Sequence, residues 1–132
     1  MSKQNRNGAK RLLVMDDEPG IRDSLNRMLG ALGYDVESAR NGHEAIALWL
    51  RAKAAHAPFH AVIFDLHIED GMGGVETVAK LRRFEPGLKA VVVSGSVNEP
   101  AMTHYHQYGF GAALPKPFDL TRLQQALQQV LA

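Results

Sequence analysis

Five side chains that could do chemistry follow directly on short apolar runs in this sequence. They are Asp16 and Asp17 after residues 12–15, Asp65 after residues 61–64, Ser94 after residues 90–93, and Lys116 after residues 112–115. Buried parallel strands read as nearly continuous apolar runs, and ligands bind outside the carboxyl ends of such strands in open α/β sheets. The four strand ends are therefore expected to form one site, with Asp65 at its centre.

Three carboxylates gathered in one crevice require a proton or a cation. Two like charges about 4 Å apart repel by roughly 4 kcal/mol at an effective dielectric of about 20. Oxygen ligands in an accessible cleft favour a hard divalent cation, and Mg²⁺ is satisfied by one or two carboxylates together with water and phosphate oxygens. Asp16, Asp17 and Asp65 therefore predict a Mg²⁺ site, the alternative for Asp16 and Asp17 being that they only cap the following helix.

A carboxylate beside such a cation is suited to attack phosphorus and form an aspartyl phosphate. Phosphoryl transfer depends mainly on positioning and on charge neutralisation. The ammonium group of Lys116 could neutralise part of the charge, and the hydroxyl of Ser94 could donate a hydrogen bond to a phosphoryl oxygen. Taken singly, Ser94 fits a strand terminator and Lys116 a surface lysine, but their joint placement favours a phosphoryl site with Asp65 as the nucleophile.

The elements that position these residues alternate between strands and helices. We expect strands at residues 11–15, 34–39, 61–65, 88–93 and 111–114, and helices that begin near residues 18, 42, 75, 100 and 119. Such alternation with short loops predicts an α/β fold with a doubly wound, five-stranded parallel sheet and five helices. The flavodoxin-like strand order 2-1-3-4-5 suits five strands and brings the first and third side by side.

Helical spacing also predicts which helix faces are buried and where one helix runs. The face of the second helix comprises Ala45, Ile46, Trp49 and Leu50, and that of the last helix Leu120, Leu123, Leu127, Val130 and Leu131. Asp119 is expected to be the N-cap of the last helix, and the fourth helix is expected to extend from about residue 98 to residue 108. Trp49 and Phe64 are expected in the core.

Composition limits the classes of protein to consider. The chain has 132 residues, enough for one domain, which we assign to residues 11–132 after a flexible tail or linker at residues 1–10. A net charge of +1 gives no general case for binding nucleic acid or an anionic membrane. The absence of cysteine excludes disulfides, thiol catalysis and cysteine zinc sites. No apolar run approaches the ~20 residues of a membrane span, so the cytoplasm is the default location.

These motifs, in this order, resemble the two-component response-regulator receiver domain over residues 10–132. The shared elements are Asp16-Asp17-Glu18, residues 39–45, Asp65, Ser94-Gly95 and Lys116-Pro117-Phe118. The resemblance implies that Asp65 accepts a phosphoryl group from a phosphohistidine on a histidine kinase or a histidine phosphotransfer domain. It also implies a conformational switch, in a domain that assists its own phosphorylation and slow dephosphorylation without being an enzyme in its own right.

The resemblance further implies a role for each residue around Asp65. Asp17 would bind Mg²⁺ directly, Asp16 directly or through water, and the backbone carbonyl of His67 would be a further ligand beside Asp65. Lys116 would pair with the phosphoryl group, and its peptide bond to Pro117 would be cis. Ser94 would move to hydrogen-bond the phosphoryl group, while Gly95 would keep the entrance open.

Residues 65–74, with Ser94-Gly95 and residues 108–110, look most like receivers at the C-terminal end of hybrid sensor histidine kinases. The chain is thus expected to be a module of such a kinase or a stand-alone receiver. Two positions depart from the family. Glu69 stands where many receivers have proline, in a loop that is one residue longer, and Ala113 stands where many have an aromatic residue that couples phosphorylation to output. Output is therefore expected through the backbone around Ser94 and residues 98–108.

Partner contacts and two other functional classes complete the expectations. Met102, Tyr105 and Leu123 are candidates for a partner-binding face, the oligomeric state is a monomer or weak dimer, and no direct contact with nucleic acid or membrane is expected. One alternative is a degenerate receiver that binds partners without phosphorylation, which the intact acid set disfavours. The other is a flavodoxin-like cofactor binder, which would need a phosphate loop rich in serine, threonine or glycine where Asp16-Asp17-Glu18 stands.

Overall fold

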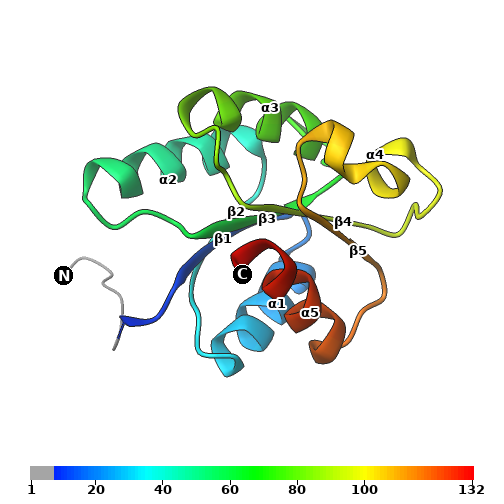
Figure 1. Ribbon diagram of the computed structural model, residues 1–132, viewed down its shortest axis with the longest axis horizontal. Helices are drawn as coiled ribbons and strands as arrows, with labels where there is room; N and C mark the ends of the chain where they lie inside the picture. The colour runs from blue at the N-terminus through cyan, green and yellow to red at the C-terminus, as the bar shows by residue number, and fades with distance from the viewer. Residues whose placement is uncertain (1–7) are drawn as a thin grey trace.

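A computed structural model describes residues 8–132, and its five strands form the single parallel sheet that the sequence predicts. Residues 1–7 of the predicted tail lie outside the described residues. The strands are β1 (Arg11–Met15), β2 (Asp35–Ala39), β3 (Ala61–Asp65), β4 (Ala90–Ser94) and β5 (Ala112–Pro115). Their order is β2-β1-β3-β4-β5, which confirms the doubly wound arrangement and puts β1 next to β3 (Figure 1).

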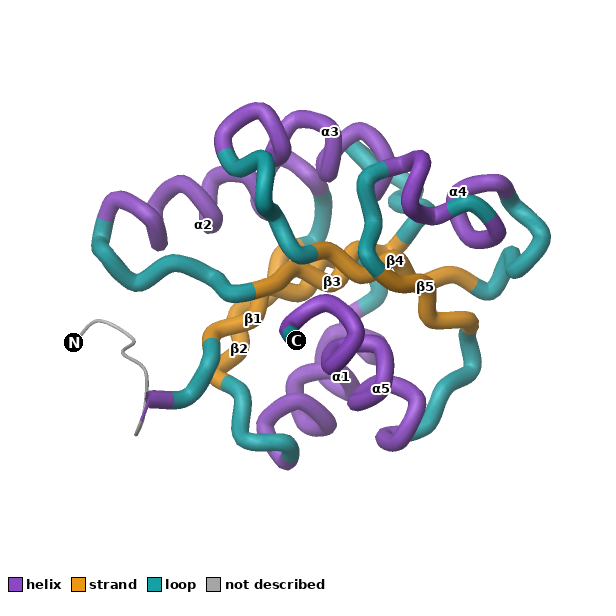
Figure 2. The backbone as a smooth tube through the Cα atoms, in the orientation of Figure 1, coloured by secondary structure: helices purple, strands orange, loops and turns teal. Residues whose placement is uncertain are grey.

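Helices cover both faces of the sheet. They are α1 (Pro19–Ala31), α2 (Gly42–Ala54), α3 (Gly74–Phe84), α4 (Pro100–Thr103) and α5 (Leu120–Leu131), with a 3-10 helix, η2, at Tyr105–Tyr108. Helices α1 and α5 lie on one face of the sheet, and α2, α3 and α4 lie on the other (Figures 1 and 2). No helix in the described part of the chain combines the length and the apolar character needed to cross a membrane.

The alternation of side chains along each strand divides the interior into two apolar layers. Leu13 and Phe64 point towards α2 and α3, where Phe64 packs edge-on against Phe110 with ring centroids 5.9 Å apart and Trp49 is buried. Leu12 and Ile63 point towards α1 and α5. Because both faces of β1, β3 and β4 are covered, these strands have no exposed residue, as their continuous apolar runs predicted.

Local capping sets where the helices begin. The side chain of Asp119 accepts a hydrogen bond of 2.9 Å from the backbone N–H of Arg122, so its predicted role as N-cap of α5 is confirmed. Asn41 caps α2 in the same way, through the backbone N–H of Glu44. Each cap satisfies a backbone N–H that has no partner inside its helix.

The helix predicted between residues 98 and 108 is interrupted. Four residues of α4 are followed by a non-helical His104 (φ −123°, ψ 46°) and then by η2. Ala101 and Met102 on one side of His104, and Phe110 beyond η2, are all buried. Buried residues therefore flank the interruption at His104 on both sides. Gly109 ends η2 in the left-handed region (φ 96°), the predicted stopping point.

Several predicted faces are wrong in detail. Leu50 and Leu120 are 40% and 41% exposed, and α2 buries Ala52 in place of Leu50. Helical spacing places both leucines on the apolar side of their helices. Each one nevertheless lies at the margin of that side, where it is not covered. Met102 and Leu123 are buried and are therefore unavailable as a partner-binding face, whereas Tyr105 is half-buried.

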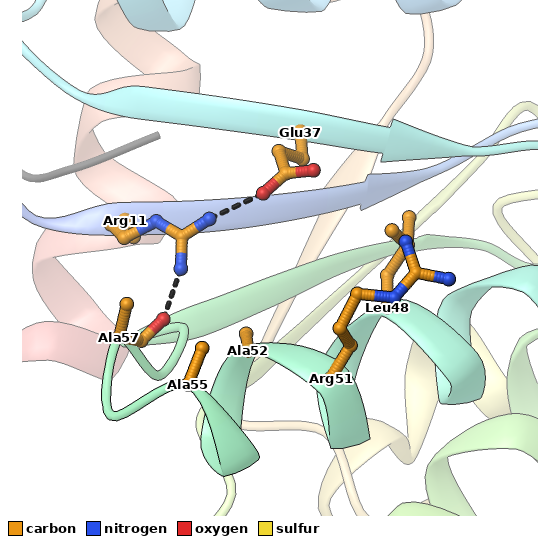
Figure 3. A pocket seen from close by; sticks show the side chains of 7 residues that line it. All are labelled: Arg11, Glu37, Leu48, Arg51, Ala52, Ala55 and Ala57. Carbon is orange, nitrogen blue, oxygen red and sulfur yellow. Dashed lines mark hydrogen bonds and ion pairs between the residues drawn. The ribbon is translucent and has the colours of Figure 1, made fainter. Parts of the chain in front are cut away.

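A buried arginine joins three segments at the amino end of the sheet. The side chain of Arg11 is only 4% exposed; it pairs with Glu37 on β2 and donates to the backbone oxygen of Ala57 (Figure 3). Its guanidinium also lies 4.6 Å from the centroid of the Phe59 ring and 3.8 Å from Asp35. Arg11 thus neutralises the acids of the edge strand and packs as an apolar side chain would.

Replacing Arg11 with methionine is therefore expected to lower the free energy of unfolding by about 2–4 kcal/mol, because Glu37 and the oxygen of Ala57 lose their partner. Urea unfolding followed by circular dichroism measures this. Arg11 and Arg51 both line a pocket between β1 and α2 (Figure 3). Arg51→Met is the matched control, since the Arg51 side chain is exposed, and a change within about 0.5 kcal/mol is expected there. Equal unfolding midpoints for the wild type and Arg11→Met would contradict a stabilising role for Arg11.

Candidate functional site

The carboxyl ends of β1, β3, β4 and β5 bring the predicted residues together. Strand register places Asp65 opposite Val93, the residue before Ser94, and Ser94 opposite Pro115, the residue before Lys116. The ammonium nitrogen of Lys116 lies 3.6 Å from an oxygen of Asp16 and 3.6 Å from an oxygen of Asp65. One cation thus faces two carboxylates that are 49 positions apart in the chain, and the predicted convergence is observed.

The acidic turn after β1 is the tightest group of possible ligands among the described residues. Single carboxylate oxygens of Asp16, Asp17 and Glu18 lie within 4.8 Å of one another. Asp16 is buried, Asp17 is half-buried and Glu18 is exposed, so the group opens from the protein interior to solvent. Oxygen donors arranged in this way suit a hard divalent cation that keeps part of its water shell. Glu18 was not among the predicted ligands.

Backbone and side-chain hydrogen bonds hold this acidic turn in place. The backbone N–H of Asp16 donates to the carbonyl of Ala39 at 3.0 Å, and its carboxylate accepts from the N–H of Glu18 at 2.9 Å. The carbonyl of Asp16 accepts a bond of 2.8 Å from the guanidinium of Arg22. The Asp17 carboxylate accepts a bond of 3.0 Å from the backbone N–H of Glu69, which is exposed. The loop that departs from the expected pattern at Glu69 therefore supports Asp17.

Burial raises the pKa values of Asp65 and Asp16. Burial raises the pKa of Asp65 to about 6, with repulsion from Asp16 adding to the effect, while Lys116 and the backbone N–H of His67 act in the opposite direction. The pKa of Asp16 is also raised, chiefly by its own burial. Lys116 therefore does not fully compensate the negative charge. A divalent cation would supply the missing charge, so the donor set fits one.

Ser94 and Gly95 form the side of the site that follows β4. Ser94 is buried, and its hydroxyl oxygen accepts a bond of 2.9 Å from the backbone N–H of Ser96, which leaves the hydroxyl hydrogen free to donate. A Cβ atom added at Gly95 would meet nothing within 4 Å, so this residue borders open space. The peptide bond between Lys116 and Pro117 is cis, as predicted, and the N–H of Lys116 donates to the carbonyl of Ser94 at 2.9 Å.

Three residues near the site have surroundings that spacing alone could not predict. The exposed imidazole of His67 contacts the carboxylate of Glu99 and so links the loop after β3 to the start of α4. Ala113 is half-buried and packs against the apolar layer beneath α4. The sequence did not indicate a role for Arg22 in the site. Its side chain bonds to a carbonyl six positions earlier, and no sequence pattern predicts such a bond.

An apolar groove borders the site on the side of α1. It has a volume of about 380 Å³ and is lined by Ile21, Ser24, Leu25, Met28, Lys116, Pro117 and Phe118. Its two walls come from segments about ninety positions apart in the chain, which explains why the sequence did not reveal it. The groove reaches Lys116, so anything seated in it would lie beside the acids.

Comparisons with known proteins agree with this geometry. The family model of the response regulator receiver domain matches residues 12–128. The response regulator receiver protein Anae109_2439 of Anaeromyxobacter sp. (strain Fw109-5) is 35% identical over 114 residues, which cover 86% of this chain and 45% of that protein. The match to the transcriptional regulatory protein GlrR of Escherichia coli (strain K12) covers 26% of the length of that protein. The chain thus spans less than half the length of these curated relatives.

Solved structures show the same fold. The chemotaxis protein CheY4 of Vibrio cholerae superposes with a TM-score of 0.80 at 29% identity, over 93% of this chain and 99% of that one. The receiver domain of sensor histidine kinase PA1611 of Pseudomonas aeruginosa PAO1 also has a TM-score of 0.80, at 22% identity, over 93% of this chain and 98% of that one. The PA1611 structure has a magnesium ion coordinated in its active-site cleft.

Proposed function

The chain belongs to the response regulator receiver domain family, and from that premise we propose that it accepts a phosphoryl group on Asp65 in two-component signalling. The observation that most supports this is the placement of the Lys116 ammonium 3.6 Å from both Asp65 and Asp16. A transferred phosphoryl group adds negative charge at this point, and a cation already faces it. Since the acids, Ser94 and Lys116 are all present and adjacent, a phosphorylation-independent receiver is not favoured.

We propose Mg²⁺ as the cofactor, held by Asp16, Asp17, Asp65 and the backbone carbonyl of His67. The raised pKa of Asp65 and Asp16 supports this, because a site that resists ionisation gains most from a bound divalent cation. When bound, the ion neutralises charge on the phosphoryl oxygens. A magnesium ion in the cleft of the PA1611 receiver domain agrees with the assignment.

In the proposed transfer, a carboxylate oxygen of Asp65 attacks the phosphorus of a phosphohistidine. The new O–P bond forms as the P–N bond breaks, and the departing imidazole keeps the electron pair and takes up a proton. Lys116 pairs with the transferred group. The Ser94 hydroxyl, whose hydrogen is free, turns to donate to a phosphoryl oxygen. These residues therefore contribute positioning and charge, which is what phosphoryl transfer requires.

The proposed partner is a histidine kinase or a histidine phosphotransfer domain, with this chain acting as a stand-alone receiver or as a module of a hybrid sensor kinase. The groove between α1 and the segment after β5 supports docking beside the site, since its apolar lining reaches Lys116. An apolar ridge on the donor, seated in this groove, would bring a phosphohistidine close to Asp65. Burial in the groove would supply affinity independent of the phosphoryl group.

Intact-mass spectrometry after incubation with acetyl phosphate tests the proposal. With Mg²⁺ the protein should gain the mass of one phosphoryl group, and with a chelator it should gain none. Borohydride reduction of the product, followed by peptide mapping, should locate the acyl phosphate at Asp65. No gain in folded protein that binds Mg²⁺ would refute phosphoacceptance from this donor, and a gain at another residue would refute the role of Asp65.

A further inference from the structure

Arg22, in the first turn of α1, contacts the acidic turn without being one of its ligands. Its guanidinium donates to the carbonyl oxygen of Asp16 at 2.8 Å, and the contact is partly buried. We propose that Arg22 is a positioning residue for the divalent-cation site, holding the peptide between Asp16 and Asp17 so that the Asp17 carboxylate stays in the ligand group. The inference deepens the proposed function and rests on it.

The argument follows from peptide geometry. The carbonyl of Asp16 and the N–H of Asp17 belong to one planar unit, so a bond to that oxygen restricts rotation of the whole peptide and the direction in which the Asp17 side chain leaves the backbone. On the other side of Asp16, the bond from its N–H to Ala39 fixes the preceding peptide. Without Arg22, the Asp16–Asp17 peptide has no other described hydrogen bond at its oxygen.

Helix stability does not account for this arginine. Arg22 is the fourth residue of α1, and a positive charge near the N-terminal end of a helix is opposed by the helix dipole. The backbone N–H of Arg22 makes the first helical bond, to Glu18, whatever the side chain is. The side chain is therefore unfavourable for the helix itself, and its contact with the acidic turn is the interaction that justifies its position.

Electrostatics alone predicts the opposite effect on cation binding. The pKa of Glu44 is lowered chiefly by its hydrogen bonds from Arg40, and the charge of Arg22 adds a smaller effect in the same direction, so that charge is felt at the start of α2. A fixed positive charge beside the acids repels a second cation, and its removal should tighten Mg²⁺ binding, most strongly at low salt. Loss of positioning should weaken Mg²⁺ binding at every salt concentration. The sign of the change therefore separates the two roles.

Isothermal titration with Mg²⁺ at low and high salt tests the inference on the whole chain. Arg22→Met keeps an unbranched, flexible side chain but removes the charge and the donors, and it is expected to weaken Mg²⁺ binding roughly tenfold at both salt concentrations. Arg22→Lys, with one shorter-reaching donor, is expected to fall between Arg22→Met and the wild type. Arg27→Met, at an exposed position of the same helix, is the matched control and should bind as the wild type does.

The outcomes are distinguishable. Equal or tighter Mg²⁺ binding by Arg22→Met, with normal binding by the wild type, would overturn the positioning role and leave the proposed function intact. Absence of Mg²⁺ binding by the wild type would overturn the proposed cofactor and the inference together. If Arg22→Met does not fold, Arg22→Ala decides, because it also removes every donor, and binding equal to the wild type would overturn the role. Urea unfolding of each variant separates loss of affinity from loss of stability.

Discussion

Asparagine at position 65 is expected to abolish phosphorylation by acetyl phosphate while leaving the fold intact. The amide is nearly the same size as the carboxyl group but lacks the anionic oxygen that attacks phosphorus. The Asp65 carboxyl is 7% exposed at the end of a fully buried strand, and its neighbour Lys116 would remain beside Asp16. Intact mass after incubation with the phosphodonor and Mg²⁺ should therefore show no phosphorylated Asp65→Asn.

Asp23→Asn is the matched control for this experiment. It makes the same chemical change at an exposed position on α1 that is not one of the site residues. It should gain one phosphoryl group as the wild type does. A full gain in Asp65→Asn would mean that another carboxylate accepts the group, and peptide mapping would then be directed to Asp16 and Asp17. Circular dichroism of Asp65→Asn establishes that the loss is chemical.

The same substitution is expected to stabilise the metal-free protein at neutral pH. The pKa of Asp65 is raised from its ordinary value of 3.8 to about 6 by burial, with Asp16 and Asp17 adding repulsion against the attraction of Lys116. An acid whose pKa rises on folding releases its proton first in the unfolded state, so the free energy of unfolding falls as pH rises from about 4 to about 6. The full loss, roughly 3 kcal/mol, is present above about pH 7.

Urea unfolding in the presence of a chelator, at several values of pH, measures this effect as the difference between Asp65→Asn and the wild type. The stabilisation should be small near pH 4 and should approach about 3 kcal/mol near pH 7. Saturating Mg²⁺ should reduce it at neutral pH, because the ion offsets the charge of Asp65 only in the wild type. A difference that does not change with pH would show that Asp65 ionises without cost and would contradict the raised pKa.

Local sequence patterns predicted the elements well where one physical rule dominated. Strands β1 and β3 have the bounds that the sequence predicts, because a strand covered on both faces is built mostly of apolar residues, here with one charged residue at an end of each strand. Asp119 was recognised as a cap because the bond to Arg122 spans only three residues. Leu50 was misassigned because helical spacing identifies an apolar stripe but not how much of it the sheet covers.

By itself, the sequence determined that Asp16, Asp65, Ser94 and Lys116 meet, because parallel strands joined by helical crossovers all end at one edge of the sheet. Only the tertiary structure decided how they meet. The equal distances from Lys116 to two acids, the raised pKa of Asp65 and the bond from Arg22 depend on contacts and burial created by packing. The spacing of residues along a chain specifies which strand end carries a side chain, but distances and dielectric surroundings exist only once the segments are packed together.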